Sequence, residues 1–149
     1  MDLKEKALEH CHTYVKTRLE GIKKEVAKIN ESLLSETKST AGDKHETGRA
    51  MLQLEREKLG QQLAVTEKLK QVLAKISLDR LTERIALGSL VETTSFTYFL
   101  AISAGKIQLG AQEVYCISPG TPVGQQLLGK SKGDSFEFKG QKSKILRIF

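Results

Sequence analysis

A seven-residue repeat of apolar side chains runs through the first part of this 149-residue chain. The repeat consists of two interleaved series, which are Leu8, Val15, Ile22 and Ile29 and, with His12 at its first position, Leu19, Val26 and Leu33. Positions three and four apart share one face of a helix, so the two series form a single seam with Lys, Glu and Arg on the other faces. The repeat therefore predicts a long helix that must bury this seam against a partner.

A second, looser apolar pattern supplies that partner. Its members are Met51, Leu52, Leu59, Leu63, Leu69, Leu73 and Ile76, with Thr66 in line. Residues 35–43, between the two patterns, are polar and typical of a turn. Two seams of similar length joined by a short polar link predict an antiparallel helical hairpin, roughly 45 Å long at ~1.5 Å per residue. Its tip is expected at about residues 38–48.

The composition changes near residue 77. Both prolines, eight of the 12 glycines and seven of the eight aromatic residues follow this point. Stretches rich in β-branched and aromatic residues predict strands at 90–94, 96–102, 113–117, 135–138 and 143–149. A short helix is expected at 123–128. The predicted fold class is α+β, with a coiled-coil hairpin domain at 1–77 and a small antiparallel β domain with one short helix at 78–149.

Several classes of protein are excluded by the sequence. No stretch approaches the ~18 apolar residues of a membrane span, and the charged start of the chain lacks the apolar region of a signal peptide. Cys11 and Cys116 are too few and too far apart for a disulfide framework. These features predict a cytoplasmic protein without a membrane partner. The net charge of +6 favours a polyanionic partner such as nucleic acid, but the surplus divides evenly between the two parts and forms no single basic stripe.

The sequence His10-Cys11-His12 has residue types that bind metals. Consecutive side chains on a helix point about 100° apart, so these three cannot converge on one ion. Cys11 and His12 fall near the seam and are expected to be packing residues. Cys116, within a predicted strand, is expected to be a small core residue.

The expected tip carries two acidic residues, Asp43 and Glu46, three positions apart. On a helix they would share one side, where two carboxylates can hold Mg²⁺. The same spacing is that of a capping box at the start of a helix, so the residues alone support both interpretations. Lys44, His45 and Arg49 are either phosphate-binding groups or a solvated helix end of mixed charge.

The segment Thr121–Asp134 predicts a proline-started helical turn, a glycine stop and a Gly-Asp turn into the next strand. It resembles the C-terminal signature of the bacterial Gre transcript cleavage factors (GreA and GreB), in which a Ser-Pro precedes a short helix that ends Leu-Ile-Gly-Lys and is followed by Gly-Asp. The matching positions are Pro122, Gly129, Lys130, Gly133 and Asp134. The tip sequence Gly42-Asp43-x-x-Glu46 is similar to the Gre motif Gly-Asp-x-x-Glu-Asn, and the order and sizes of the two parts agree.

The resemblance implies an accessory factor of RNA polymerase that is not itself an enzyme. An FKBP-like C-terminal domain would bind the polymerase, and the hairpin would enter its secondary channel. Asp43 and Glu46 would then help to hold the second Mg²⁺ of the polymerase centre, which cuts backtracked RNA. The protein would have no cofactor of its own beyond this shared Mg²⁺. Lys44, His45 and Arg49 would contact the polymerase or the 3′ end of the nascent RNA. We expect a monomer.

The tip also departs from the Gre pattern. The family usually has Asn after the second acidic residue and then, two residues on, an aromatic residue, whereas this chain has Thr47, Gly48, Arg49 and Ala50. The usual Thr-Pro opening of the N-terminus is also missing. One alternative is therefore a Gre-like regulator that occupies the channel without stimulating cleavage. A peptidyl-prolyl isomerase or chaperone is another, because aromatic residues cluster in the second part, and a plain coiled-coil adaptor is the last.

Overall fold

The computed structural model describes residues 2–38 and 42–149, except for the side chains of residues 37, 38 and 42–46. Its elements are α1 (Leu3–Lys38), α2 (Gly42–Ala74), β1 (Leu90–Thr93), β2 (Thr97–Leu100), β3 (Gly105–Leu109), β4 (Gln112–Ile117), α3 (Pro122–Leu127), β5 (Ser135–Phe138) and β6 (Gln141–Ile148). The chain forms two compact units. The hairpin unit is Val15–Leu69, and the sheet unit combines Met1–Tyr14 with Lys70–Phe149. The predicted α+β class is confirmed, whereas the domain boundary near residue 77 stays a prediction.

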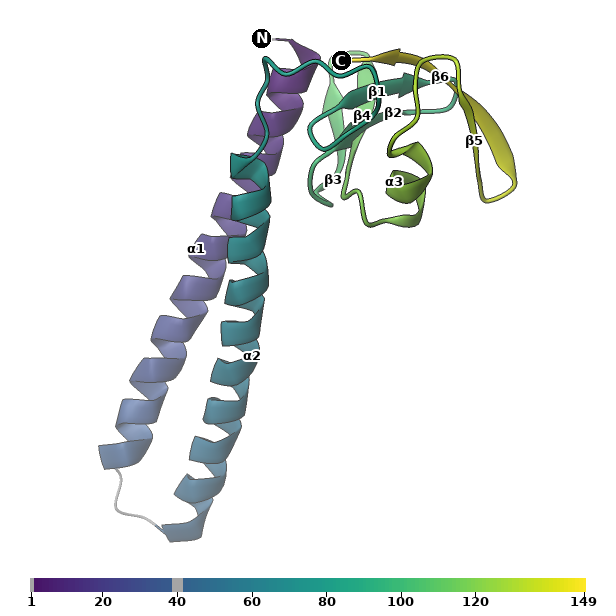
Figure 1. The fold of residues 1–149 in the computed structure, drawn as a ribbon. Helices are drawn as coiled ribbons and strands as arrows, with labels where there is room; N and C mark the ends of the chain where they lie inside the picture. The colour runs from purple at the N-terminus through teal and green to yellow at the C-terminus, as the bar shows by residue number, and fades with distance from the viewer. Residues whose placement is uncertain (1, 39–41) are drawn as a thin grey trace. The chain divides into compact units, whose positions relative to one another are not determined.

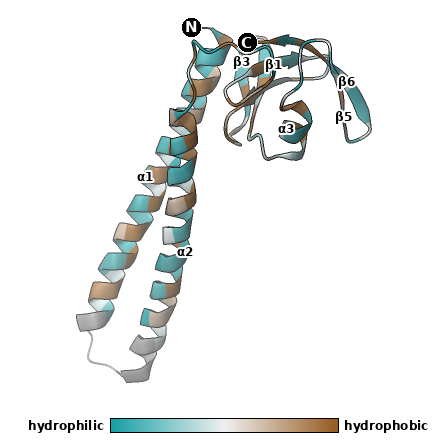
Figure 2. Ribbon diagram, viewed as in Figure 1, coloured by the Kyte–Doolittle hydropathy of each residue, from teal (hydrophilic) through white to brown (hydrophobic). Residues whose placement is uncertain are grey.

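In the hairpin unit, α1 and α2 run side by side, as Figure 1 shows. The apolar core of this unit is thin: Ile22, Ile29 and Leu59 are buried, and Val26, Leu33, Leu52 and Leu63 pack against them half-buried. Figure 2 shows the same pattern as isolated hydrophobic residues among hydrophilic ones along both helices. Arg56 Nε donates a hydrogen bond of 2.9 Å to Asn30 Oδ1 across the pair. The predicted pair of long helices is therefore confirmed.

The seam of α2 repeats strictly every seven residues. Its positions are Leu52, Leu59, Thr66 and Leu73, all buried or half-buried. The one polar member, Thr66, is only 1% exposed, and its hydroxyl donates to the Gln62 carbonyl of the same helix at 2.7 Å. This bond satisfies the hydroxyl without a partner on α1. Met51, expected in the seam, is 67% exposed, because it lies one position outside this repeat.

The seam of α1 changes its spacing towards the N-terminus. Cys11 is buried and His12 is exposed, so the expectation that His12 packs in the seam is wrong. The buried positions Ala7, Cys11, Val15 and Leu19 follow at intervals of four, which exceed the 3.6 residues of a helical turn. Each such step rotates the buried face around the helix. The apolar stripe of the first turns, which belong to the sheet unit, therefore turns away from the heptad positions.

The sheet unit contains six strands in the order β3-β4-β2-β1-β6-β5. Neighbouring strands are antiparallel except β2 and β4, which pair in parallel, so the expectation of a wholly antiparallel sheet is wrong at this pair. The cause is β3, which forms a hairpin with β4 at the edge of the sheet and reverses the chain before β4 joins β2. The strand Gly105–Leu109 was not predicted from the sequence.

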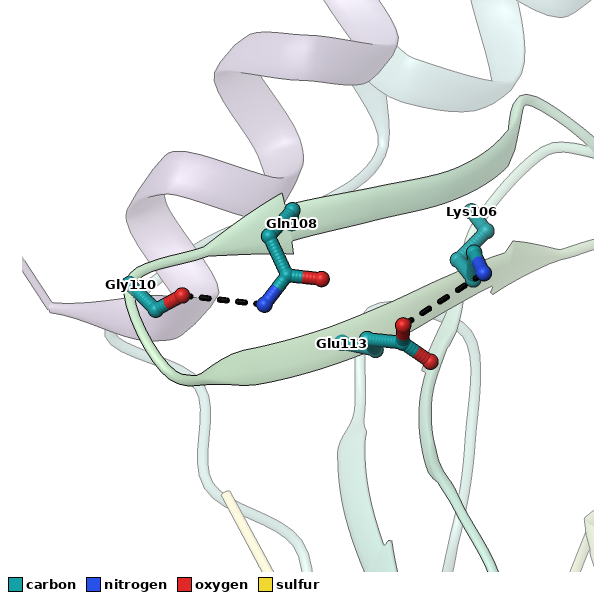
Figure 3. Close-up of polar contacts among 4 residues, drawn as sticks. All are labelled: Lys106, Gln108, Gly110 and Glu113. Carbon is teal, nitrogen blue, oxygen red and sulfur yellow. Dashed lines mark hydrogen bonds and ion pairs between the residues drawn. The ribbon is translucent and has the colours of Figure 1, made fainter.

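Tight turns close the two edge hairpins. In β3–β4 the turn residue Gly110 has φ +65°, and its carbonyl accepts a 2.9 Å hydrogen bond from Gln108 Nε2. Lys106 and Glu113 lie diagonally across these strands, with Lys106 Nζ 3.4 Å from Glu113 Oε1 (Figure 3). In β5–β6 both turn residues, Lys139 and Gly140, have positive φ, which is the pattern of a type I′ turn. Turn geometry thus fixes the register of both edge strands.

One hydrophobic core cluster of the sheet unit lies between the sheet and α3. Its buried members are Ile85, Val91, Tyr98, Leu100, Val123, Leu127, Phe136 and Ile145. Val123 and Leu127 are four positions apart on α3, so one face of this short helix supplies both. An FKBP-like identity for this domain stays a prediction. No helix in the described residues is long and apolar enough to cross a membrane.

Adjacent substitutions in α2 should change stability in opposite directions. Leu59 is 5% exposed in the core of the hairpin unit, so Leu59→Ala should lower the free energy of unfolding by about 2–4 kcal/mol. The next residue, Gly60, is exposed, and a Cβ built there meets nothing within 4 Å. Gly60→Ala should therefore raise the free energy of unfolding by about 1 kcal/mol, because alanine has the higher helix propensity. Urea unfolding followed by circular dichroism measures both values, and a Gly60→Ala variant as unstable as Leu59→Ala would contradict the assigned helix faces.

Candidate functional site

The predicted acidic pair lies at the start of α2. This helix begins at Gly42, so positions 43 and 46 are one turn apart on a helical backbone. The side chains of Asp43, Lys44, His45 and Glu46 lie outside the described residues. Metal binding by the two carboxylates and the capping box therefore both stay predictions.

A third acidic group, which residue spacing did not indicate, lies beside the first turns of α2. A Cβ built on Gly48 would lie 3.4 Å from Oε1 of Glu36, so the Glu36 carboxylate lies beside the backbone of α2. Arg49 is half-buried and Thr47 is exposed. Gly48, which has no side chain, leaves space for this acidic group next to the first turns of α2.

The Gre-like signature begins with a well-defined helix cap. Thr121 is the N-cap of α3; its hydroxyl donates to the Ser118 carbonyl at 2.8 Å and accepts from the Gly124 amide at 3.1 Å. Pro122 then takes the first helical position, where its missing N–H costs no hydrogen bond. The predicted proline-started helix is confirmed in this form.

Gly124 has a steric role that residue spacing did not reveal. A Cβ at this position would lie 2.3 Å from the Ser118 carbonyl oxygen and 3.0 Å from Pro119 Cα. Both are backbone atoms, so a small rotamer change cannot relieve the overlap. Glycine therefore allows the 118–121 loop to fold tightly over α3.

The second half of the signature fixes the chain after α3. Gly129 has φ +82°, and its amide donates to the Ile85 carbonyl at 2.8 Å, while the Ile85 amide donates to the Lys130 carbonyl at 2.8 Å. These reciprocal bonds attach the irregular segment before β1 to the end of the helix. Gly129 takes the left-handed conformation that commonly ends a helix.

The Gly133-Asp134 turn connects this region to β6. Asp134 Oδ2 accepts a 2.8 Å hydrogen bond from the Ser131 amide, and Gly133 has φ +90°. The amide of Gly133 donates to the Ile145 carbonyl, and the amide of Ile145 donates to the Asp134 carbonyl, both at 2.8 Å. Four signature residues, Pro122, Gly129, Gly133 and Asp134, thus shape the backbone in this structure.

Three aromatic residues of the sheet unit pack on one another. The ring of Phe96 meets Tyr115 edge-on, with centroids 5.0 Å apart, and meets Tyr98 edge-on at 6.2 Å. Burial, with a smaller contribution from Tyr115, raises the pKa of the Tyr98 hydroxyl. The pocket beside this cluster is lined by Phe96 but not by either tyrosine. The cluster therefore contributes one aromatic ring to that pocket.

The three residues at positions 10–12 do not converge. His10 Nε2 donates to the Ala104 carbonyl at 3.1 Å, Cys11 is buried, and His12 is exposed. No group of three or more His, Cys, Asp or Glu side chains able to hold a metal occurs among the residues with described side chains. Cys116 is buried, as expected of a small core residue.

Comparison with known proteins gave a likeness among solved structures. No family model matches the chain, and no curated protein matches it in sequence. Among solved structures, the transcription factor Gfh1 is 20% identical, with 90% of each chain covered and a TM-score of 0.35.

The steric role of Gly124 can be tested by one methyl group. Gly124→Ala should lower the free energy of unfolding by about 1–3 kcal/mol, because the overlap with the Ser118 carbonyl exceeds the gain in helix propensity. Gln125→Ala, at the next and exposed position of the same helix, is the matched control and should stay within about 0.5 kcal/mol of the original protein. Thermal unfolding compares the two variants. Equal melting temperatures would show that the 118–121 loop accommodates the added methyl group without loss of stability.

Proposed function

We propose that this protein is an RNA polymerase accessory factor that stimulates cleavage of backtracked RNA by the polymerase. The observation that carries the proposal is the joint occurrence of two Gre-like motifs in one architecture. The C-terminal motif forms a capped helix in the sheet unit, and Gly42-Asp43-x-x-Glu46 begins the second of two long paired helices.

The length of the helices supports delivery of the tip into a channel. The 36 residues of α1 extend roughly 54 Å at ~1.5 Å per residue. The hairpin unit has a thin core and mostly exposed side chains, which suits a rod that works in a solvated channel. The sheet unit would provide the larger surface needed to bind the polymerase.

Asp43 and Glu46 fit the chemistry of a shared Mg²⁺. They are hard oxygen donors one turn apart on a helical backbone, and Mg²⁺ bound to one or two carboxylates keeps most of its other positions for water and phosphate. Bound there, Mg²⁺ would supply Lewis-acid activation of the water that attacks the phosphodiester. Lys44, His45 and Arg49 would bind and orient the phosphates of the RNA 3′ end.

The experiment is RNA shortening in stalled elongation complexes. Asp43→Ala with Glu46→Ala should reduce the stimulated cleavage rate by on the order of 100-fold, because both proposed metal ligands are lost. Binding to the polymerase, measured by co-sedimentation, should persist through the sheet unit. A double variant that cleaves as fast as the original protein would refute the metal role.

A matched variant separates metal binding from capping. Asp43→Asn with Glu46→Gln keeps side-chain oxygens that can accept helix-capping hydrogen bonds but removes both negative charges. If the carboxylates bind Mg²⁺, this variant should be as defective as the alanine variant, and added Mg²⁺ should partly restore it. Full activity of the amide variant would instead assign the pair to the helix cap.

The departure of the tip from the Gre pattern favours one alternative. With Thr47 and Arg49 where the family usually has Asn and an aromatic residue, the protein would occupy the channel without stimulating cleavage. It would then compete with a cleavage-active Gre factor and produce no shortened RNA. Isomerase activity has less support, because the pocket beside the aromatic cluster is lined by one of its three rings.

A further inference from the structure

The two cysteines, far apart in the sequence, meet in the sheet unit. Cys11 on α1 is 0% exposed and Cys116 on β4 is 3% exposed, and both are free thiols. The side chains of Cys11 and Cys116 interact with each other in this unit. Both belong to the same compact unit, which takes its first turns of α1 from residues 1–14.

Backbone contacts on both sides fix this approach. One position before Cys11, His10 Nε2 donates to the Ala104 carbonyl at 3.1 Å, and the Ala104 amide donates to the Cys116 carbonyl at 3.2 Å. These two bonds link α1 to the backbone of Cys116 independently of the sulfur contact. Cys116 itself is held in the sheet, paired with Phe99 of β2 and Gly105 of β3.

We propose that Cys11 and Cys116 are a modification site that forms a reversible intramolecular disulfide, tying the first turns of α1 to β4. The oxidant is a small disulfide such as oxidised glutathione. The Cys11 thiolate attacks one sulfur of the oxidant, which forms a mixed disulfide and releases one small thiolate. Cys116 then loses its proton to solvent, and its sulfur attacks the Cys11 sulfur and releases the second small thiolate. Two protein thiols are oxidised, and one small disulfide is reduced to two thiols.

The surroundings of the two sulfurs differ in the closed state. The hydrogen bond from Cys116 lowers the pKa of the Cys11 thiol, aided by a backbone hydrogen bond at Ile102 and opposed by burial. The same contact and burial raise the pKa of Cys116. In the closed state Cys11 is therefore the more acidic of the two thiols, and once the contact has opened the reverse order, with Cys116 attacking first, gives the same disulfide.

Burial makes the reaction depend on local opening. An oxidant reaches the sulfurs only when the first turns of α1 separate from β4, so a low urea concentration that favours this opening should accelerate oxidation. Once formed, the bond closes a loop of about 100 residues and restricts the unfolded chain. The oxidised protein should melt about 5 °C or more above the reduced protein.

The test treats the reduced full-length chain with oxidised glutathione, with and without low urea. A non-reducing tryptic digest analysed by mass spectrometry should contain one peptide pair joined through Cys11 and Cys116. Dithiothreitol should remove both the link and the gain in melting temperature. Cys116→Ala is the matched control, and it should stop at a glutathione adduct on Cys11.

Three outcomes would overturn the proposal. They are two glutathione adducts on one chain without a link, disulfide-bonded dimers as the main product, and unreacted thiols at urea concentrations where amide hydrogen exchange shows the first turns of α1 to be open. Each is measured on the original sequence, so the conclusion does not depend on the folding of a cysteine variant.

Discussion

The hairpin unit depends on one narrow apolar seam between two helices. A helix pair can bury only a single stripe from each partner, so few side chains are withdrawn from water over the length of the unit. Ile22, Ile29 and Leu59 form the buried centre of that seam. Since the core is one layer deep, each of these residues carries a large share of the stability, and the faces outside the seam are free to carry charge.

The seven-residue repeat predicted this unit well because it depends on local periodicity. The same rule failed at the first turns of α1, where Cys11 rather than His12 is buried. There the helix belongs to the sheet unit, and its buried face is set by contacts such as His10 with Ala104, which are distant in sequence. The edge strand β3 was missed because its short Gly-Lys-Ile-Gln-Leu sequence buries only Ile107. Its position also explains the unexpected parallel pair, which strand propensities cannot indicate.

The candidate site was likewise predictable from the sequence only in part. The positions of Pro122 and Gly129 could be predicted because helix starts and stops have local sequence signals. The need for glycine at position 124 could not be predicted, since it arises from the Ser118 carbonyl folding back over α3. The approach of Cys11 to Cys116 was likewise hidden by their separation in sequence. The metal-binding role of Asp43 and Glu46 is still a prediction from motif and spacing.

The sheet unit consists of segments that are synthesised at very different times. Residues 1–14 are made first, whereas β6, which lies between β1 and β5, is made after every other strand. The helices of Val15–Leu69 are complete before any strand is synthesised. The hairpin can therefore form early. The apolar face that includes Ala7 and Cys11 stays exposed until the sheet has formed. During synthesis this exposed apolar face is open to aggregation.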